Sequence, residues 1–281
     1  MIRLRTMAML VAFELLAGGP IRAQTSTDAA IKQKAIADLK MMAEAGDSKS
    51  QVQLGLAYVT GDGVHKDDTE GVKWLRKAAD QDNMIAERYL AEMYFKGRGV
   101  EASTTEAARW LRMAAEQGDA QSQHNLAALY TQGEGVPRNQ KEAANWMRKS
   151  ADQGLAAAQL GLGIFYENGE GVPEDPAEAA RWYRKAVEQN YPDAMNDLAL
   201  LLATARSSTL RNPEEAIALA TRAVAAGNNP DYLDTLAAAY FAAGQTDKAI
   251  ETEGKALQRA PENDTYKKAM EKYLGAAHGN H

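Results

Sequence analysis

Pairs of glycines are the residues of this sequence that come nearest to a known chemical motif. Gly61 and Gly63 form the first Gly-x-Gly pair, and three further pairs follow at regular distances. A glycine-rich loop that holds phosphate groups follows a β-strand and opens a helix. Residues 97–102, GRGVEA, match the letters of a dinucleotide fingerprint, but a helical pattern precedes them. We therefore interpret the glycines as turns that end helices, and we predict no cofactor.

Arginine side chains recur at one position, where they could form a binding stripe for a polyanion. They are Arg76, Arg112, Arg148 and Arg184. An acidic residue follows each arginine one helical turn later, and such pairs largely cancel the local field. The formal net charge of −6 also disfavours nucleic acid and anionic membrane surfaces as partners. We interpret the arginines as a solvent-exposed helix face.

Histidine and cysteine form no metal-binding or nucleophilic constellation. His65 and His124 lie far apart in the sequence, and His278 and His281 are the one close pair. The chain contains no cysteine, which excludes a disulfide framework, a thiolate metal site and a cysteine nucleophile. Neither the G-x-S-x-G motif nor the S-x-x-K motif occurs. We predict that the protein is not an enzyme and holds no metal ion.

A common step of 36 residues underlies these recurrences. Aromatic residues follow the same step, at Tyr58, Tyr94, Tyr130 and Tyr166, and at Trp74, Trp110, Trp146 and Trp182. A fixed period in this range is typical of stacked units that cannot bury their apolar faces alone. Large aromatic side chains bury the most area per residue. We therefore predict that the tryptophans form the core between units and do not line a ligand groove.

Each period contains two helical patterns that are separated by the glycine turn. Apolar spacing predicts first helices over residues 48–60, 84–96, 120–132 and 155–168. Second helices are expected to open at Asp68, Thr104, Gln140 and Pro176. The predicted fold is all-α, a right-handed α-solenoid of stacked antiparallel helix pairs.

The start of the chain departs from the repeat. Residues 1–23 combine Arg3 and Arg5 with an apolar run and a small residue at Ala23, which is the layout of a cleaved signal peptide. A membrane anchor is the alternative, but the run is shorter than the ~20 residues of a span. We therefore predict an exported protein, periplasmic or secreted, with no stable membrane span after cleavage.

The remaining chain is divided by its changes of pattern. We assign residues 24–45 to a helix that caps the array and residues 46–190 to four repeats. After Asn190 a longer loop, ATARSSTLRN, replaces the glycine turn, so residues 191–274 are assigned to helix pairs of another type and a final cap helix. Residues 275–281 are expected to be a disordered tail.

Residues 46–190 resemble four Sel-one-like repeats. That family's pattern is Gly-Asp-x-x-Ala-x-x-x-Leu-Gly-x-x-Tyr, then Gly-x-Gly-Val, then Ala-x-x-Trp-x-x-x-Ala-Ala, and residues 118–154 match it almost completely. Residues 191–274 resemble the related tetratricopeptide repeat, through Leu236, Tyr240, Ala249, Ala256 and Pro261. The resemblance implies a superhelix of helix pairs over nearly the whole chain after residue 23.

The resemblance also implies a non-enzymatic scaffold that binds a protein or peptide in a concave groove formed by the first helices. Carried over unit by unit, the groove positions are Val52, Leu56, Arg88, Glu92, Phe95, His124, Leu160, Ile164, Asn196, Leu200, Asp234 and Phe241. Asp193 and Asp231 add to the acidity at the carboxy-terminal end. A partner with apolar anchors and a basic end is therefore expected.

Two other functions stay open. Some cysteine-rich secreted members of the family are described as binding or hydrolysing β-lactams, which would make this protein a hydrolase. Those members carry a cysteine pair in each repeat, and this chain has no cysteine. The second alternative is a structural subunit of an envelope complex, in which core and groove both serve assembly.

Overall fold

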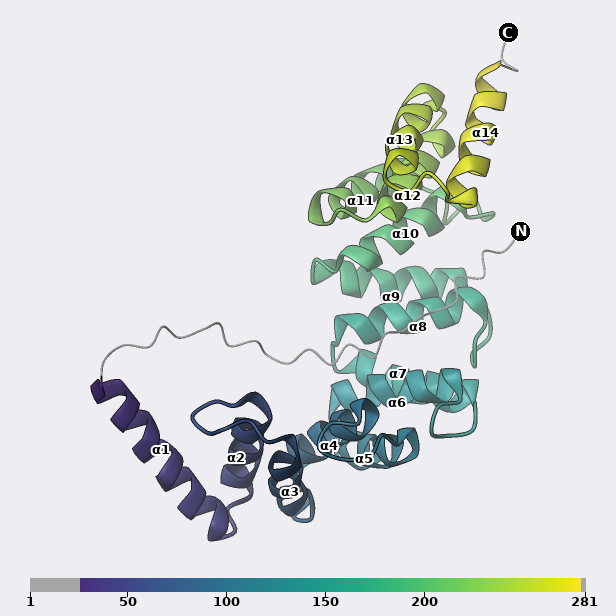
Figure 1. Cartoon of the computed structure of the whole chain (residues 1–281). Coiled ribbons are helices and arrows are strands. Elements are labelled where there is room, and N and C mark those ends of the chain that lie inside the picture. The colour runs from purple at the N-terminus through teal and green to yellow at the C-terminus, as the bar shows by residue number, and fades with distance from the viewer. Residues whose placement is uncertain (1–25, 279–281) are drawn as a thin grey trace. The chain divides into compact units, whose positions relative to one another are not determined.

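A computed structural model describes residues 26–278 (Figure 1). This part of the chain contains fourteen helices and no strand, and consecutive helices pack as pairs. The predicted all-α solenoid of stacked helix pairs is thereby confirmed. The predicted signal peptide, residues 1–23, lies outside the described residues. The chain divides into two compact units, with the division after Ser150.

Unit 1 consists of the helices up to Ser150, and each helix from α1 to α5 packs against the next one along the chain. Its helices are α1 (Ser26–Glu44), α2 (Ser48–Thr60), α3 (Asp68–Ala79), α4 (Met84–Lys96), α5 (Thr104–Glu116), α6 (Ala120–Gln132) and most of α7 (Gln140–Asp152). The first helices α2, α4 and α6 begin and end where the sequence analysis predicted. Helix α1 supplies the cap against which α2 packs.

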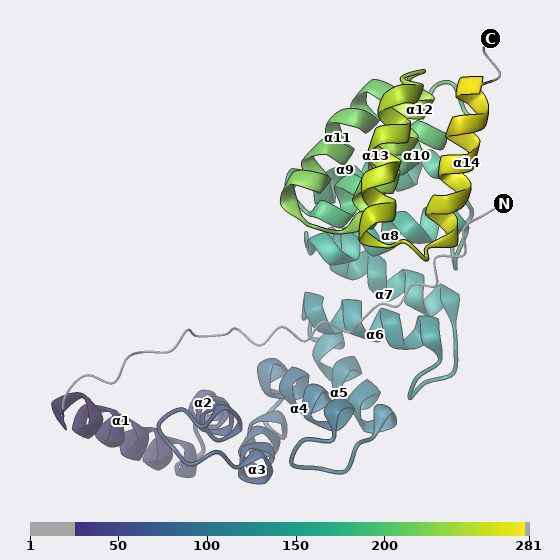
Figure 2. The ribbon, with the colours of Figure 1, turned by 45° about the horizontal axis from the view of Figure 1, so that its top comes forward.

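Unit 2 continues the alternation of first and second helices to the end of α14. Its helices are α8 (Ala156–Asn168), α9 (Pro176–Glu188), α10 (Pro192–Thr204), α11 (Pro213–Ala226), α12 (Pro230–Ala242), α13 (Thr246–Arg259) and α14 (Asp264–His278). Helix α10 packs against both α9 and α11, and α14 packs against α13 and α12 (Figure 2). Helix α14 runs to His278, so residues 275–278 are helical where a disordered tail was expected. Two alanines in this segment favour the helix.

Polar caps and glycines fix the helix ends. The Asp47 carboxylate accepts a hydrogen bond from the Ser50 N–H at 2.7 Å, and the Asp119 carboxylate accepts one from the Ser122 N–H at 2.8 Å. At the other end, Gly97 has a left-handed φ of 64° and its N–H donates to the carbonyl of the preceding turn. Such glycines end helices without strain. The interpretation of the first glycine in each pair as a helix-ending turn is confirmed.

The second glycine of the pair lets two backbones touch. A Cβ atom on Gly99 would lie 2.2 Å from the carbonyl oxygen of Asp68, and one on Gly135 would lie 2.1 Å from that of Thr104. Both contacts are to the first turn of the preceding second helix. Each of these turns therefore rests on the repeat before it, and any side chain at this position would prevent the contact.

The core runs along the stack as recurring apolar positions. One leucine of each first helix is almost completely buried, at Leu54, Leu90, Leu126, Leu162 and Leu198. All four tryptophans are buried, with at most 8% of any of them exposed, as predicted for core residues. Paired alanines on the second helices, such as Ala114 and Ala115, allow the close approach of neighbouring helices. Between residues 26 and 278, no helix combines the length and the apolar character needed to cross a membrane.

Candidate functional site

The first helices carry all twelve residues that the sequence analysis assigned to a groove. Seven of them are partly exposed, namely Leu56, Arg88, Phe95, Leu160, Ile164, Leu200 and Phe241. The other five are buried, namely Val52, Glu92, His124, Asn196 and Asp234. Six belong to unit 1 and six to unit 2, so they form two separate sets. Within each set, the partly exposed members are the ones that a partner can reach.

In unit 1 the charged members of the set already have partners. The Arg88 guanidinium lies 3.7 Å from the Asp119 carboxylate, which caps α6. The Glu92 carboxylate lies 2.7 Å from the Lys96 ammonium group on the same helix. These pairs leave the unit 1 face with balanced charge. Both are therefore structural contacts as well as candidate contacts for a partner.

His124 on α6 is a buried histidine. Burial lowers the pKa of its imidazole below the ordinary value, although contact with Asn125 opposes the shift. The Nδ1 atom lies 3.3 Å from Oδ1 of Asn125, which also accepts from Gln121 at 3.0 Å. Its position inside the packing between helices makes it a core residue more than a groove residue.

In unit 2 the partly exposed members are apolar. Leu160 and Ile164 on α8 pack at the edge of the core cluster that contains Met195 and Leu198, and Leu200 on α10 is likewise half-buried. The side chains keep part of their surface in solvent. They form a set of apolar anchors on adjacent first helices.

The same three first helices of unit 2 are acidic. Helices α8, α10 and α12 contain no lysine or arginine, and they carry Glu167, Asp193, Asp197, Asp231 and Asp234. Carboxylates next to apolar side chains favour a partner that is both basic and apolar. This charge asymmetry distinguishes unit 2 from the balanced first helices of unit 1.

Two of these carboxylates also join consecutive first helices. The hydroxyl of Tyr232 on α12 donates to Asp193 of α10 at 2.6 Å, and the hydroxyl of Tyr266 on α14 donates to Asp231 of α12 at 2.6 Å. Burial and the neighbouring carboxylate raise the pKa of both tyrosines, so they stay protonated donors. The sequence alone indicates only that these aspartates add negative charge for a partner. Their role in holding α10, α12 and α14 together was missed.

Phe241 differs from the other candidates because α14 covers it. Its ring centroid lies 4.7 Å from that of Tyr273, and the Lys272 ammonium group lies 4.7 Å above the Phe241 ring. The last helix therefore fills the place that a partner would take next to α12. Phe241 is therefore part of the packing under α14 and is not open to a partner.

The exposed arginines are inter-repeat contacts. Arg76, Arg112 and Arg184 are exposed as predicted, whereas Arg148 is half-buried. Arg112 donates to the Tyr130 hydroxyl of the next first helix at 2.6 Å, and Arg76 donates to Tyr94 in the same way. The predicted pairing of Arg76 and Arg112 with the acidic residue one helical turn later was therefore wrong. The ring and hydroxyl of the next repeat offer a partner that is fixed by packing. At the end of the series Arg184 spans to Glu215, 3.2 Å away, because Leu202 stands where the tyrosine would be.

A buried glutamine joins successive helices, and the sequence analysis missed it. Gln51, Gln123 and Gln159 each donate from Nε2 to the carbonyl at the end of the preceding helix, at 3.0, 3.0 and 3.3 Å. In turn, Gln81 and Gln189 donate to the side-chain oxygens of Gln51 and Gln159. The recurrence of glutamine at the 36-residue step was the available signal.

Glu87 replaces this glutamine in the second repeat. Its carboxylate accepts from Gln117 Nε2 at 2.8 Å, but a carboxylate offers no N–H to the preceding helix. Burial raises the pKa of Glu87 to about 7, with a contribution from Asp82 and against the effect of the Gln117 hydrogen bond. Glu87 therefore titrates near neutral pH.

The titratable residues between 26 and 278 form no group of three or more that could hold a metal ion. The arrangement on the first helices offers apolar anchors, carboxylates and hydrogen-bonding groups. These are the ingredients of a protein-binding surface.

Solved structures place the chain among helical repeat proteins. A Sel1 repeat protein from Oxalobacter formigenes matches with 28% identity and a TM-score of 0.67, over 86% of this chain and 96% of that one. The protein c5321, a protective antigen of uropathogenic Escherichia coli with an SLR fold, matches with 31% identity and a TM-score of 0.56, over 81% of this chain. The chain spans 57% of that antigen's length. YrrB, a TPR protein with an unusual peptide-binding site, shares the fold at 18% identity and a TM-score of 0.52, over 70% of this chain and 97% of that one.

No curated protein matches the chain significantly. The sequence profile of the Sel1 repeat matches residues 48–83, 85–119, 120–155, 156–191 and 192–228. The fifth match covers a helix pair that the sequence analysis had assigned to the tetratricopeptide type, and that assignment stays a prediction for residues 229–274. Repeats of this fold generally mediate protein–protein interactions. With five repeats over more than half of its length, the chain belongs to the Sel1 repeat family.

Proposed function

We propose that this protein is an exported, non-enzymatic scaffold that holds a partner protein or peptide on the first helices of unit 2. The observation that carries the proposal is the combination found on α8, α10 and α12. Partly exposed apolar side chains lie on helices that have five carboxylates, four of them at least partly exposed, and no basic residue. A segment with apolar anchors and lysine or arginine side chains is complementary to that surface.

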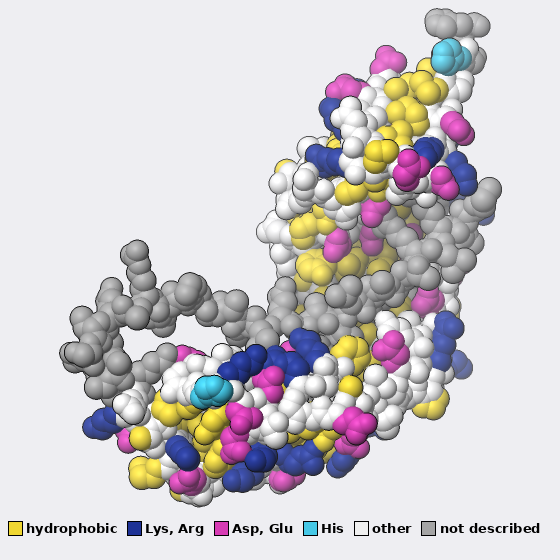
Figure 3. All heavy atoms as spheres, in the orientation of Figure 1, with side chains coloured by type: hydrophobic (Ala, Val, Ile, Leu, Met, Phe, Trp, Pro, Cys, Tyr) yellow, Lys and Arg dark blue, Asp and Glu magenta, His cyan; other side chains and the backbone are white. Residues whose placement is uncertain are grey.

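The unit 2 surface supports this choice more strongly than the unit 1 surface does. In unit 1, Arg88 and Glu92 are paired within the protein, whereas in unit 2 Leu160, Ile164 and Leu200 present apolar surface. Figure 3 shows hydrophobic and acidic side chains next to one another on the displayed face of unit 2. Apolar anchors supply most of the affinity in such interfaces, and the surrounding charges steer association and select the partner.

Export is supported by the sequence alone, through Arg3, Arg5 and the apolar run before Ala23. Mass spectrometry of the protein from its native host should find the amino terminus near Gln24. A cytosolic protein that begins at Met1 would contradict export but would leave the binding proposal intact.

Binding is tested with a partner captured from the exported fraction of the native host and then purified. Replacing Leu160 and Leu200 together by alanine should weaken its binding about tenfold or more, because central apolar anchors each contribute ~2 kcal/mol when they matter. Isothermal titration calorimetry measures the affinity. Raising the salt concentration should also weaken binding, because part of the attraction is between charges in solvent.

The matched control is Arg112→Ala on α5, a second helix of unit 1. It should leave the affinity nearly unchanged, and circular dichroism melts must show that all variants fold. If Arg112→Ala loses the partner and the leucine variant keeps it, the second helices are the working surface. That result would overturn the proposed site.

A further inference from the structure

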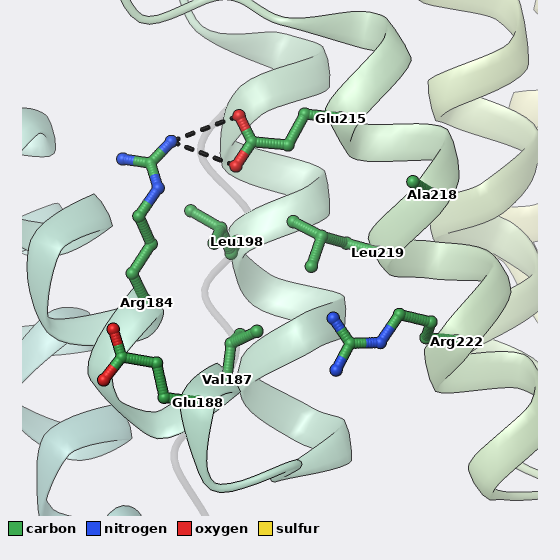
Figure 4. Close-up of a pocket in the computed structure, with 8 residues that line it drawn as sticks. All are labelled: Arg184, Val187, Glu188, Leu198, Glu215, Ala218, Leu219 and Arg222. Atoms are coloured by element: carbon green, nitrogen blue, oxygen red, sulfur yellow. Dashed lines mark hydrogen bonds and ion pairs between the residues drawn. The ribbon is translucent and has the colours of Figure 1, made fainter.

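A hollow of about 390 Å³ opens to solvent between α9, α10 and α11 in unit 2. Its apolar part consists of Val187 from α9, Leu198 from α10 and Leu219 from α11. Figure 4 shows these three side chains lying near one another from three helices, with Arg184 and Arg222 to either side. The hollow belongs to the second helices and to the helix between them, so it is distinct from the proposed binding surface.

The repeat pattern identifies what fills this place elsewhere. In the first repeat, Ala43, Leu54 and Trp74 form one buried cluster, from the preceding helix, the first helix and the second helix. At the 36-residue step, Val187 corresponds to Ala43 and Leu198 corresponds to Leu54. The walls of the hollow are therefore the walls that surround a tryptophan in the first repeat.

The third wall of the hollow is Leu219, which stands at the position that a tryptophan occupies in the earlier repeats. The connection between α10 and α11 is one residue longer than its counterpart, as Pro213 stands 37 residues after Pro176. With that extra residue, Leu219 corresponds to Trp182. Their exposure agrees, since Trp182 and Leu219 are 4% and 7% exposed. A leucine side chain is much smaller than an indole ring, so the space beyond it stays open.

Arg222, at the rim of the hollow, stands at a position where earlier repeats have a cation over an aromatic ring. In three repeats a lysine lies over the tryptophan three residues before it, as Lys185 does over Trp182 at 3.5 Å. Arg222 occupies the position of Lys185 in the longer register and lines the hollow. Its guanidinium donates to Asn190 at 3.0 Å, which holds it at the edge of the hollow. Arginine stacks on aromatic faces readily.

We propose that this hollow receives the aromatic side chain, preferably tryptophan, of a partner protein. Apolar spaces lined by leucine and valine bind aromatic rings because the ring regains the contacts that the space lacks. A tryptophan of this chain, or of a second copy of it, cannot enter the hollow, because all four tryptophans are buried in the protein's own core. An open hollow with a charged rim also suits a ring that is attached to a polypeptide, whose backbone remains outside.

The test uses the full-length protein with labelled valine and leucine methyl groups, followed by NMR. The probe is the blocked peptide Gly-Ala-Trp-Ala-Gly, and the matched peptide has alanine in place of tryptophan. Ring-current shifts of the Val187, Leu198 and Leu219 methyl groups are expected with the first peptide and not with the second. Leu219→Trp should fill the hollow from within, as in the other repeats, and weaken peptide binding at least tenfold, to about the level of the alanine peptide.

A second variant keeps the test decisive if Leu219→Trp does not fold. Arg222→Ala removes the stacking cation from an exposed position and should weaken binding about threefold. Arg211→Ala, an exposed arginine outside the hollow, should leave the affinity unchanged. Absence of methyl shifts with the tryptophan peptide, or unchanged binding to folded Leu219→Trp, would overturn the proposal. If free indole binds as tightly as the peptide, the hollow is a small-molecule site and a partner protein is the wrong source.

Discussion

Residues 48–191 form four helix pairs and residues 192–228 form a fifth pair of the same kind. The two regions differ in the side chains at the joints, by which we mean the contacts between neighbouring repeats. The earlier repeats have a Gly-x-Gly turn, a buried tryptophan and, in α3 and α5, arginines that reach the tyrosine of the next repeat. The later repeat has a longer connection, Leu219 and an arginine that reaches Glu215. Yet α10 packs against α11 around Leu198, Leu202 and Ala220, as the earlier pairs do around their own leucines and alanines.

The difference separates two kinds of residue in the repeat. The leucines and alanines hold the two helices of a pair together, and they persist in residues 192–228. The second glycine, the tryptophan and the arginine contact the neighbouring repeat, as Gly99 does at Asp68 and Trp74 does at Ala43. Much of the most visible sequence signature therefore describes the joint between repeats, and it lapses where the joint changes.

The largest expected effect is the loss of a joint tryptophan. Trp146→Ala should lower the free energy of unfolding by about 3–5 kcal/mol, as for other large buried aromatic residues. Leu219→Ala, at the corresponding position beside the hollow, should cost only about 2 kcal/mol, at the lower end for leucine. Urea denaturation measures both. Equal costs for the two variants would mean that the tryptophan joint is no stronger than its leucine replacement.

Amide hydrogen exchange shows which helices are destabilised by Trp146→Ala. Because damage in such an array stays local, Trp146→Ala should increase exchange first within the third repeat, in α6 and α7. Uniform protection that matches the wild type would contradict the assignment of Trp146 to a joint.

The next effect concerns the glycine turn. Gly135→Val places a β-branched residue at a φ of 66° and pushes Cβ into the backbone of Thr104, so we expect a loss on the order of 1–3 kcal/mol. The matched control is Gly118→Asn, where a Cβ atom would meet no other atom within 4 Å and where other repeats have Asp82 or Asn190 at positive φ. The control should cost less than about 1 kcal/mol. Thermal melts of both variants decide, and equal losses would show that backbone approach is unimportant.

The smallest expected effect is a pH-dependent change in stability at Glu87, which stands at the position of the buried glutamine. Glu87 has a folded-state pKa of about 7, above its ordinary value, so the folded protein binds the proton more tightly than the unfolded chain does. Stability that is present below the unfolded pKa is therefore lost as pH rises from ~4.5 to ~7. Glu87→Gln removes this loss and restores an N–H donor, so it should stabilise by on the order of 1 kcal/mol at pH 8 and little at pH 4.5.

The reverse change is the control. Gln123→Glu should introduce the same loss of stability with rising pH into the third repeat. Melting temperatures of the three proteins between pH 4.5 and pH 8 measure the difference. A constant difference between Glu87→Gln and the wild type across this range would exclude Glu87 as the titrating group.

The sequence predicts the fold in detail because its signals are local and repeated. Caps, glycine turns and apolar spacing placed α2, α4 and α6 at their observed bounds, and the recurring tryptophans were correctly assigned to the core. The site was harder, because contacts between repeats join residues that lie about 18 to 39 positions apart. Sequence spacing alone did not show that Asp193 accepts from Tyr232 or that α14 covers Phe241. The connection before α11 is one residue longer, so a fixed period of 36 residues does not align Leu219 with Trp182. For this reason the replacement of the tryptophan by leucine was not apparent from the sequence.

The contact of Gly99 and Gly135 with the repeat before them has a consequence for how such a chain can change its length. In residues 48–155 the glycines Gly99 and Gly135, and the arginines Arg76 and Arg112, each contact a neighbouring repeat at a constant offset. Gain or loss of a whole 36-residue block there preserves every offset, so a chain with one block more or fewer keeps its joints. Residues 192–228 follow a step of 37 residues and make other contacts, so exchange of a 36-residue block does not preserve the offsets there.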